Sequence, residues 1–164
     1  MKYSGFVLSV LLFLAGTAFA GVLALDSPDK NITISVDIAE NIRYAVAWRG
    51  QEVIRPSEIS LLLDRERHLG DQPRLQKSRR AAVDRMLEPV VRQKSARIRD
   101  HYNEMVLDFK GGYSLIFRAY DNGVAWRWVT RLPGRVKVLY EQAVFDFAAD
   151  HTLYFGEEPS FYSH

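Results

Sequence analysis

The stretch from Arg97 to Val129 constrains the fold of this 164-residue chain more than any other part of its sequence. Apolar and polar residues alternate in three runs, which two glycine-containing turns separate. Alternate residues of a β-strand point to the same face of a sheet. One face of the middle run would carry Tyr113, Leu115, Phe117 and Ala119. A meander of three strands is marginal alone, so it is predicted to pack against the rest of the chain.

Both turns of the meander contain residues that tolerate a positive φ. The first is Lys110-Gly111-Gly112 and the second is Asp121-Asn122-Gly123. Glycine and asparagine enter the left-handed region more easily than other residues, and tight hairpins often need it. The sequence therefore predicts left-handed residues in both turns.

The flanking segments also read as strands, and none shows a long helical period. Ile32–Ile38 and Asn41–Trp48 alternate cleanly, whereas Pro56 is expected to end the run that starts at Val53. Two further strands are expected at Arg135–Tyr140 and Gln142–Phe147. About ten short strands without a long helix predict an all-β chain that forms an antiparallel β-sandwich.

Residues 65–99 are more ambiguous, because 11 of the 22 lysines and arginines fall there against four acidic residues. We expect a long connection with a short helix or irregular turn at Ser78–Leu87, which Pro89 would end. Such a basic run can bind nucleic acid, but a solvated surface is the preferred interpretation. The net charge of +2 falls to +1 without Lys2, so composition gives no reason to expect a nucleic acid, a membrane surface or a polyanion as partner.

The N-terminus predicts export. Lys2 precedes an apolar run from Phe6 to Ala15, and Ala18-Phe19-Ala20 has the small-x-small form of a signal peptidase site. Residues 1–20 are therefore interpreted as a signal peptide and residues 21–164 as the exported domain, with an uncleaved anchor as the alternative. The chain has no cysteine. An exported domain without disulfides suits the bacterial periplasm.

Residues with obvious catalytic spacing are scarce. The sequence contains no zinc-binding pair of Cys-x-x-Cys or His-Glu-x-x-His type and no Gly-x-Ser-x-Gly. Asp100 and Glu104 could act as a carboxylate pair, but neighbouring arginines favour an ion network. His101 is interpreted as a packed or hydrogen-bonded imidazole and not as a catalyst. Trp126 and Trp128 could stack on a sugar ring, although a place in the core between two sheets is favoured.

Three sequence phrases resemble the N-terminal domain of glycoside hydrolase family 97. They are Ile-Arg-Asp-His-Tyr-Asn-Glu-Met at 98–105, Phe-Arg-Ala-Tyr-Asp-Asn-Gly-Val-Ala-Trp-Arg-Trp at 117–128 and Ser-Phe-Tyr-Ser-His at 160–164. The opening at 25–32 also fits. The resemblance implies an exported bacterial α-glucosidase or α-galactosidase whose first domain is a galactose-mutarotase-like super-sandwich. A catalytic (β/α)-barrel and a small β-domain would follow.

The resemblance also implies a calcium ion in the active site, held by glutamates of which the sandwich supplies one. That glutamate is expected soon after His164, so Glu157 and Glu158 are poor substitutes and no metal ligand is assigned here. Tyr162 and His164 are the candidate carbohydrate-binding residues, because they precede that ligand in sequence. The barrel and its catalytic carboxylates would lie beyond residue 164, so the sandwich is expected to be incomplete at its C-terminal end.

The sequence thus predicts the N-terminal sandwich of a periplasmic α-glycosidase, acting on oligosaccharides through a barrel domain and not catalytic alone. The alternative is an independent carbohydrate-binding sandwich that uses Trp126 or Trp128 as its platform.

Overall fold

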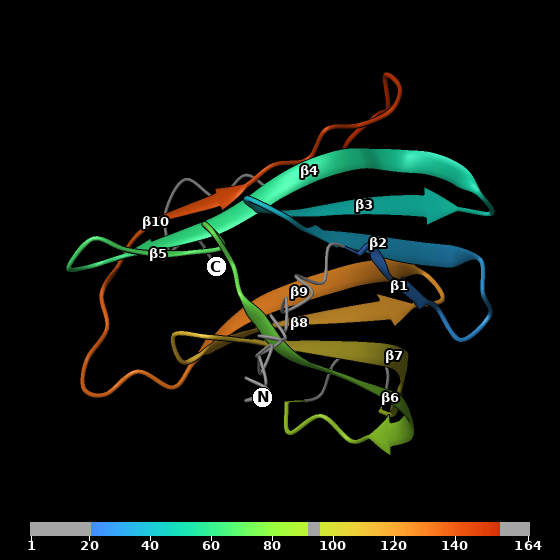
Figure 1. Cartoon of the computed structure of the whole chain (residues 1–164). Coiled ribbons are helices and arrows are strands. Elements are labelled where there is room, and N and C mark those ends of the chain that lie inside the picture. Colours follow the sequence, from blue (N-terminus) through green and yellow to red (C-terminus); the bar gives the residue numbers. More distant parts are fainter. Residues whose placement is uncertain (1–20, 92–95, 155–164) are drawn as a thin grey trace, which may run out of the picture.

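A computed structural model describes residues 21–91 and 96–154, which form two antiparallel β-sheets facing each other (Figure 1). The strands of these residues are β1 (Leu23–Asp26), β2 (Ile32–Ile38), β3 (Ile42–Trp48), β4 (Gln51–Leu63), β5 (Arg67–Leu69), β6 (Leu75–Leu87), β7 (Ile98–Phe109), β8 (Tyr113–Tyr120), β9 (Gly123–Thr130) and β10 (Val138–Ala143). The described part contains no helix. The predicted antiparallel β-sandwich is confirmed.

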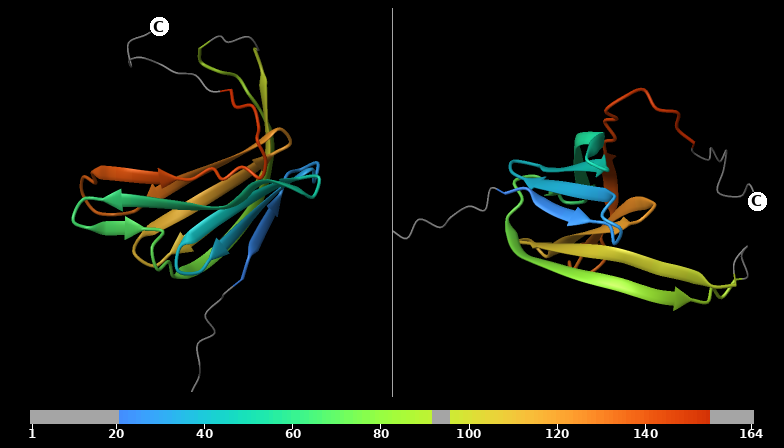
Figure 2. Two further views of the ribbon diagram at one scale, coloured as in Figure 1. Left: turned by 90° about the horizontal axis from the view of Figure 1, so that it is seen from above. Right: turned by 90° about the vertical axis from the view of Figure 1, so that its right-hand side faces the viewer.

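The first sheet has the strand order β1-β2-β3-β4-β10, with β5 paired to β4, and the second has the order β6-β7-β8-β9. All strand pairs are antiparallel. The distal ends of β6 and β7 reach beyond the sandwich as a two-stranded ribbon (Figure 2). The inner face of this ribbon is therefore open on the side where the first sheet ends.

The core lies between the sheets and comes mainly from alternate residues of β2, β3, β4, β7 and β8. On β2, Ile32, Ile34, Val36 and Ile38 are buried, as the alternation predicts. The opposing sheet contributes Met105, Leu107, Phe109, Tyr113, Leu115, Phe117 and Ala119. The face predicted for the middle strand of the meander is thus confirmed.

Trp126 and Trp128 belong to this core. Both are partly buried and pack against the cluster of buried residues. The Trp126 ring lies 6.3 Å from that of Tyr44 on the opposite sheet, and the Trp128 ring lies 6.0 Å from that of Tyr113. The expectation that these tryptophans fill space between the sheets is confirmed.

The two turns of the meander differ. Gly111 and Gly112 have φ values of 104° and 77°, as predicted. The prediction was wrong for the second turn, since neither Asn122 nor Gly123 has a positive φ. Gly123 pairs directly with Tyr120, so only two residues lie in the loop. The carboxylate of one of them, Asp121, holds this loop by accepting a hydrogen bond from the backbone N–H of Asp29.

Pro56 does not end a strand, contrary to expectation. β4 continues through it, because the ladder with β3 shifts at this point: Tyr44 pairs with Ser57 and Val46 with Ile54. Two residues, Arg55 and Pro56, therefore oppose one. A β-bulge is a position where a strand tolerates a residue without an N–H.

The described residues of this region, 65–91 and 96–99, form β5, β6 and the start of β7, and not the expected long connection with a short helix or irregular turn. β6 pairs with β7 along its whole length, from Leu75 opposite Phe109 to Leu87 opposite Ile98. Almost all side chains of β6 are exposed on both faces. An edge strand with two solvated faces lacks the alternation by which strands are predicted, and this explains the error.

The segment 135–147 forms one regular strand where two were expected. β10 starts at Val138 and ends at Ala143, and beyond it Phe147 makes an isolated bridge with Ile54. Arg55 holds this region, because its guanidinium donates hydrogen bonds to the Asp146 carboxylate and to two backbone carbonyls, those of Phe147 and Ala148. These side-chain contacts, together with backbone hydrogen bonds such as that from the Ala148 N–H to the carbonyl of Val53, hold the segment in place of a second regular strand.

Within residues 21–91 and 96–154, no helix is long and apolar enough to cross a membrane. The predicted signal peptide, residues 1–20, lies outside the described residues and stays a prediction.

Candidate functional site

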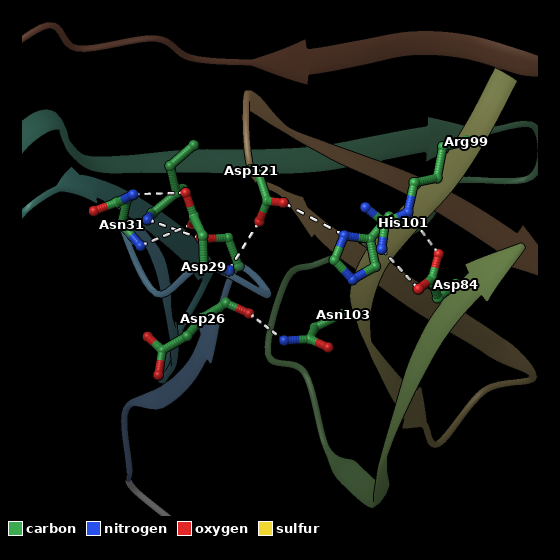
Figure 3. A network of polar contacts seen from close by, with 10 residues as sticks. Asp26, Asp29, Asn31, Asp84, Arg99, His101, Asn103 and Asp121 are labelled. Carbon is green, nitrogen blue, oxygen red and sulfur yellow. Dashed lines mark hydrogen bonds and ion pairs between the residues drawn. The ribbon is translucent and has the colours of Figure 1, made fainter.

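The most extensive polar network lies at the end of the sandwich where β1 turns into β2 and β8 turns into β9 (Figure 3). Three parts of the chain meet there: the loop after β1, the Asp121 turn and the inner face of the β6–β7 ribbon. The labelled members of this network are Asp26, Asp29, Asn31, Asp84, Arg99, His101, Asn103 and Asp121. We call these residues the polar network.

Asp29 organises the loop between β1 and β2. Its carboxylate accepts a hydrogen bond from the Ser27 hydroxyl at 2.5 Å and bonds from the backbone and side-chain N–H groups of Asn31 at 3.0 and 2.6 Å. The Ser27 hydroxyl, followed by the bonds from Asn31, lowers the pKa of Asp29 from 3.8 to about 2. Lys30 between them has a φ of 61°, so the side chain of Asp29 stabilises a turn that β-strand backbone cannot make.

Asp121 connects this loop to β7. One carboxylate oxygen accepts a hydrogen bond from the Asp29 N–H at 2.9 Å, and the other lies 3.4 Å from Nδ1 of His101. The amide of Asn103 donates a hydrogen bond to the carbonyl of Asp26 at 2.8 Å. These contacts tie the first sheet to the second and fix the angle of the ribbon.

The ribbon itself carries ion pairs between its strands. Arg99 donates two hydrogen bonds to Asp84, both 2.8 Å long, and this pairing lowers the pKa of Asp84. Asp100 pairs with Arg85 at 2.8 Å. In the neighbouring ladder, Glu104 pairs with Arg118 at 2.8 Å.

Asp100 and Glu104 are therefore members of an ion network, as preferred from the sequence, and each has its own arginine. His101 is half-buried, and its Nδ1 atom lies 3.4 Å from a carboxylate oxygen of Asp121. A general acid needs a carboxyl group whose pKa is raised towards the working pH. The carboxylates whose pKa values shift, Asp29, Asp84 and Asp108, all shift downwards. These contacts favour a structural role for the polar network, in holding the two sheets and the ribbon together, over a role in acid–base catalysis.

The residues that the structure describes do not fit a calcium ion. Among residues 21–91 and 96–154, no three histidine, aspartate or glutamate side chains come together as a metal site would require. We derive no step through a metal from this part of the chain. Tyr162, His164, Glu157 and Glu158 lie outside the described residues, and the sugar-binding assignment of Tyr162 and His164 stays a prediction.

The lowered pKa of Asp29 predicts acid sensitivity. The folded carboxylate is stabilised relative to the unfolded one, so its contribution to stability is present above about pH 4 and is lost as the pH falls towards about 2. Urea unfolding at pH 5 and at pH 2.5 should show a loss of stability that is smaller in Asp29→Asn. Asp37→Asn is the matched control, because Asp37 makes no side-chain hydrogen bond to another described residue. An equal pH dependence in both variants would contradict this role of Asp29.

Comparison with known proteins places this architecture in a family. The profile described as Glycosyl-hydrolase 97 N-terminal matches residues 25–164. This chain belongs to that family. The match includes both the loop organised by Asp29 and the complete meander, so the polar network is built from residues of the family domain.

Similar proteins are much longer than this chain. A retaining alpha-galactosidase of Bacteroides thetaiotaomicron is 30% identical over 152 residues, which are 93% of this chain and 23% of that enzyme. A glycoside hydrolase family 97 enzyme of Pseudoalteromonas sp. strain K8, solved with panose, matches 73% of this chain and 20% of its own, with 21% identity and a TM-score of 0.64. A beta-arabinopyranosidase matches 76% and 21%, with 22% identity and a TM-score of 0.67. The chain thus spans between a fifth and a quarter of these relatives.

Sequence reasoning missed Asp29 and Asp121 as members of one network. A signal for the first existed, since Ser27-Pro28-Asp29-Lys30-Asn31 has the composition of a turn closed by an aspartate side chain. No local signal connects it with Asp121, which lies 92 residues away.

Proposed function

We propose that this chain is the non-catalytic N-terminal sandwich of an exported, periplasmic α-glycosidase, and that it supports the catalytic barrel and helps to form its sugar site. The observation that carries the proposal is the family match over residues 25–164, combined with the small share of the related enzymes that the chain spans. The substrate of the parent enzyme would be an α-linked oligosaccharide, since a family 97 relative was captured with panose. Calcium, if the parent binds it, would take its ligands from outside the described residues.

An exposed apolar surface supports a role in packing against another domain. β10 exposes three consecutive apolar side chains: Val138, Leu139 and Tyr140 are 54%, 53% and 62% exposed. Among the described strands, β10 pairs only with β4, so its outer edge is open. Exposed apolar strand edges are usually covered in working proteins. We propose that the remainder of the parent enzyme covers this one.

Two measurements test the proposal together. Sequencing the gene beyond the codon for His164 should reveal an open frame that encodes a barrel, with a glutamate soon after that codon. The chain alone should not hydrolyse p-nitrophenyl α-galactoside or α-glucoside above the buffer rate, with or without added calcium. A stop codon after His164, or turnover that Glu104→Gln abolishes, would contradict the proposal.

An independent sugar-binding module is the weaker candidate, because Trp126 and Trp128 pack in the core and present no open platform. Calorimetric titration with maltooligosaccharides and galactosides tests it directly. Binding that disappears in a folded Trp126→Ala variant would favour that module over a supporting domain.

A further inference from the structure

A second candidate site lies at the opposite end of the sandwich from the polar network, where β7 turns into β8. A cleft of about 730 Å³ opens there. Figure 1 shows that β5, the β7–β8 turn and the segment after β9 come together at this end. The cleft is lined by Arg67, His68, Leu69, Asp71, Gln72, Arg74, Lys110, Gly111, Gly112, Tyr113, Arg131, Leu132 and Pro133.

Backbone hydrogen bonds hold the walls of this cleft together. The N–H of Lys110 donates to the carbonyl of Arg74 at 2.9 Å, and the N–H of Arg131 donates to the carbonyl of Gly112 at 2.8 Å. The floor is apolar and firmly packed, because Leu69 and Tyr113 are only 2% and 5% exposed. The Tyr113 ring stacks on that of Phe109 at 5.0 Å. The cleft is thus a fixed depression between both sheets.

Its rim is strongly cationic. Arg67, Arg74, Lys110 and Arg131 line it against one carboxylate, that of Asp71, which leaves an excess of three positive charges with His68 neutral. The first three form no ion pair with any side chain in the described ranges. Arg131 lies 3.3 Å from one carboxylate oxygen of Asp108, and Arg79 lies 2.9 Å from the other, so the two arginines share this carboxylate. Since the whole chain carries only +2, this charge is concentrated locally.

We propose that the cleft binds an acidic saccharide, one that carries a carboxylate or a sulfate group, with the anionic group at the Arg67–Arg74–Lys110 rim. Guanidinium groups form paired hydrogen bonds with such planar or tetrahedral oxyanions, and a cleft focuses the field of its charges. Leu132 and Pro133 also line the cleft, and their half-buried and exposed side chains offer apolar contacts for the C–H face of a sugar ring. The volume falls in the range of small-ligand sites. The choice of a saccharide rests on the proposed function as part of a carbohydrate-active enzyme.

Calorimetric titration of the full chain tests this site. Trigalacturonate, a sulfated galactan trisaccharide and neutral maltotriose would be compared at constant ionic strength. We expect one or both acidic ligands to bind and neutral maltotriose to show no binding. Arg67→Gln/Arg74→Gln should weaken that binding about tenfold or more, because each arginine supplies charge-assisted hydrogen bonds.

The matched control is Arg43→Gln/Arg127→Gln, which removes the same charge from exposed positions outside the cleft. This variant should bind within about twofold of the unchanged chain if the cleft is the site, because long-range charge effects are screened by salt. Thermal unfolding of both variants verifies that they fold. Binding of neither acidic ligand, equal losses in the two variants, or equally tight binding of sodium sulfate would overturn the proposal. None of these outcomes affects the gene-sequence and hydrolysis tests of the parent enzyme.

Discussion

Gly70→Ala is expected to lower the free energy of unfolding by about 3 kcal/mol, since it combines backbone strain with a collision. Gly70 has a φ of 94°, which side-chain-bearing residues rarely adopt. A Cβ atom there would lie 2.8 Å from the carbonyl oxygen of Ile59, which is backbone of the central part of β4 and cannot move aside cheaply. It would also lie 3.2 Å from the Trp128 ring. Urea unfolding monitored by tryptophan fluorescence measures the loss.

Gly50→Ala separates strain from collision. Gly50 also has a positive φ, of 79°, but nothing lies within 4 Å of a Cβ atom built there. Its substitution should cost only about 1 kcal/mol, from the left-handed backbone alone. Equal losses in the two variants would show that the contact with Ile59 is unimportant. Gly70 also positions the loop before β6, because its carbonyl accepts a hydrogen bond from Ile42 at 3.2 Å, so Gly70→Ala should disturb the cationic cleft too.

The parts of the fold that the sequence predicted well are strands with one buried face. Ile34 and Val36 are buried, while the alternate residues Thr33 and Ser35 are half-buried. The order of apolar and polar residues thus matches the order of buried and more exposed side chains. The same holds for the alternation around Phe117. Such strands are predictable because burial requires apolar residues at every second position.

Strand prediction failed where the backbone pairs with a neighbouring strand but the side chains are not buried. β6 is held by a full ladder with β7 and by cross-strand ion pairs, such as Arg79 with Asp108. Every residue can accept a backbone hydrogen bond and every residue except proline can donate one, so a ladder leaves no compositional pattern. Pro56 was wrongly predicted to end a strand. It is tolerated in β4 because a bulge removes the need for an N–H at this position, and the bulge arises from the pairing with β3, which the local sequence does not reveal.

The candidate sites were less predictable than the fold, because they join distant segments. Asp29 and Asp121 meet only after β1, β2, β8 and β9 have been placed. The cleft combines Arg67 of β5, Lys110 of the β7–β8 turn and Arg131 of the segment after β9. Among these, only the excess of basic residues in 65–99 was visible in the sequence, and its concentration at one end of the sandwich was not. The family resemblance supplied the likeness to a glycoside hydrolase, which no spacing of residues indicated.

Phe117→Ala is expected to lower the free energy of unfolding by about 4 kcal/mol, the typical cost of removing a buried phenylalanine ring. Phe117 is fully buried at the centre of the second sheet and pairs with Met105 and Trp126 on its two neighbouring strands. Its neighbour Ile116 points to the opposite, outer face, where it is half-buried. Ile116→Ala should therefore cost less than half as much, although it removes an apolar side chain from the same strand. Chemical denaturation of both variants decides the matter: similar losses would mean that the outer face is covered as well as the inner one, and that the core does not lie only between the two sheets.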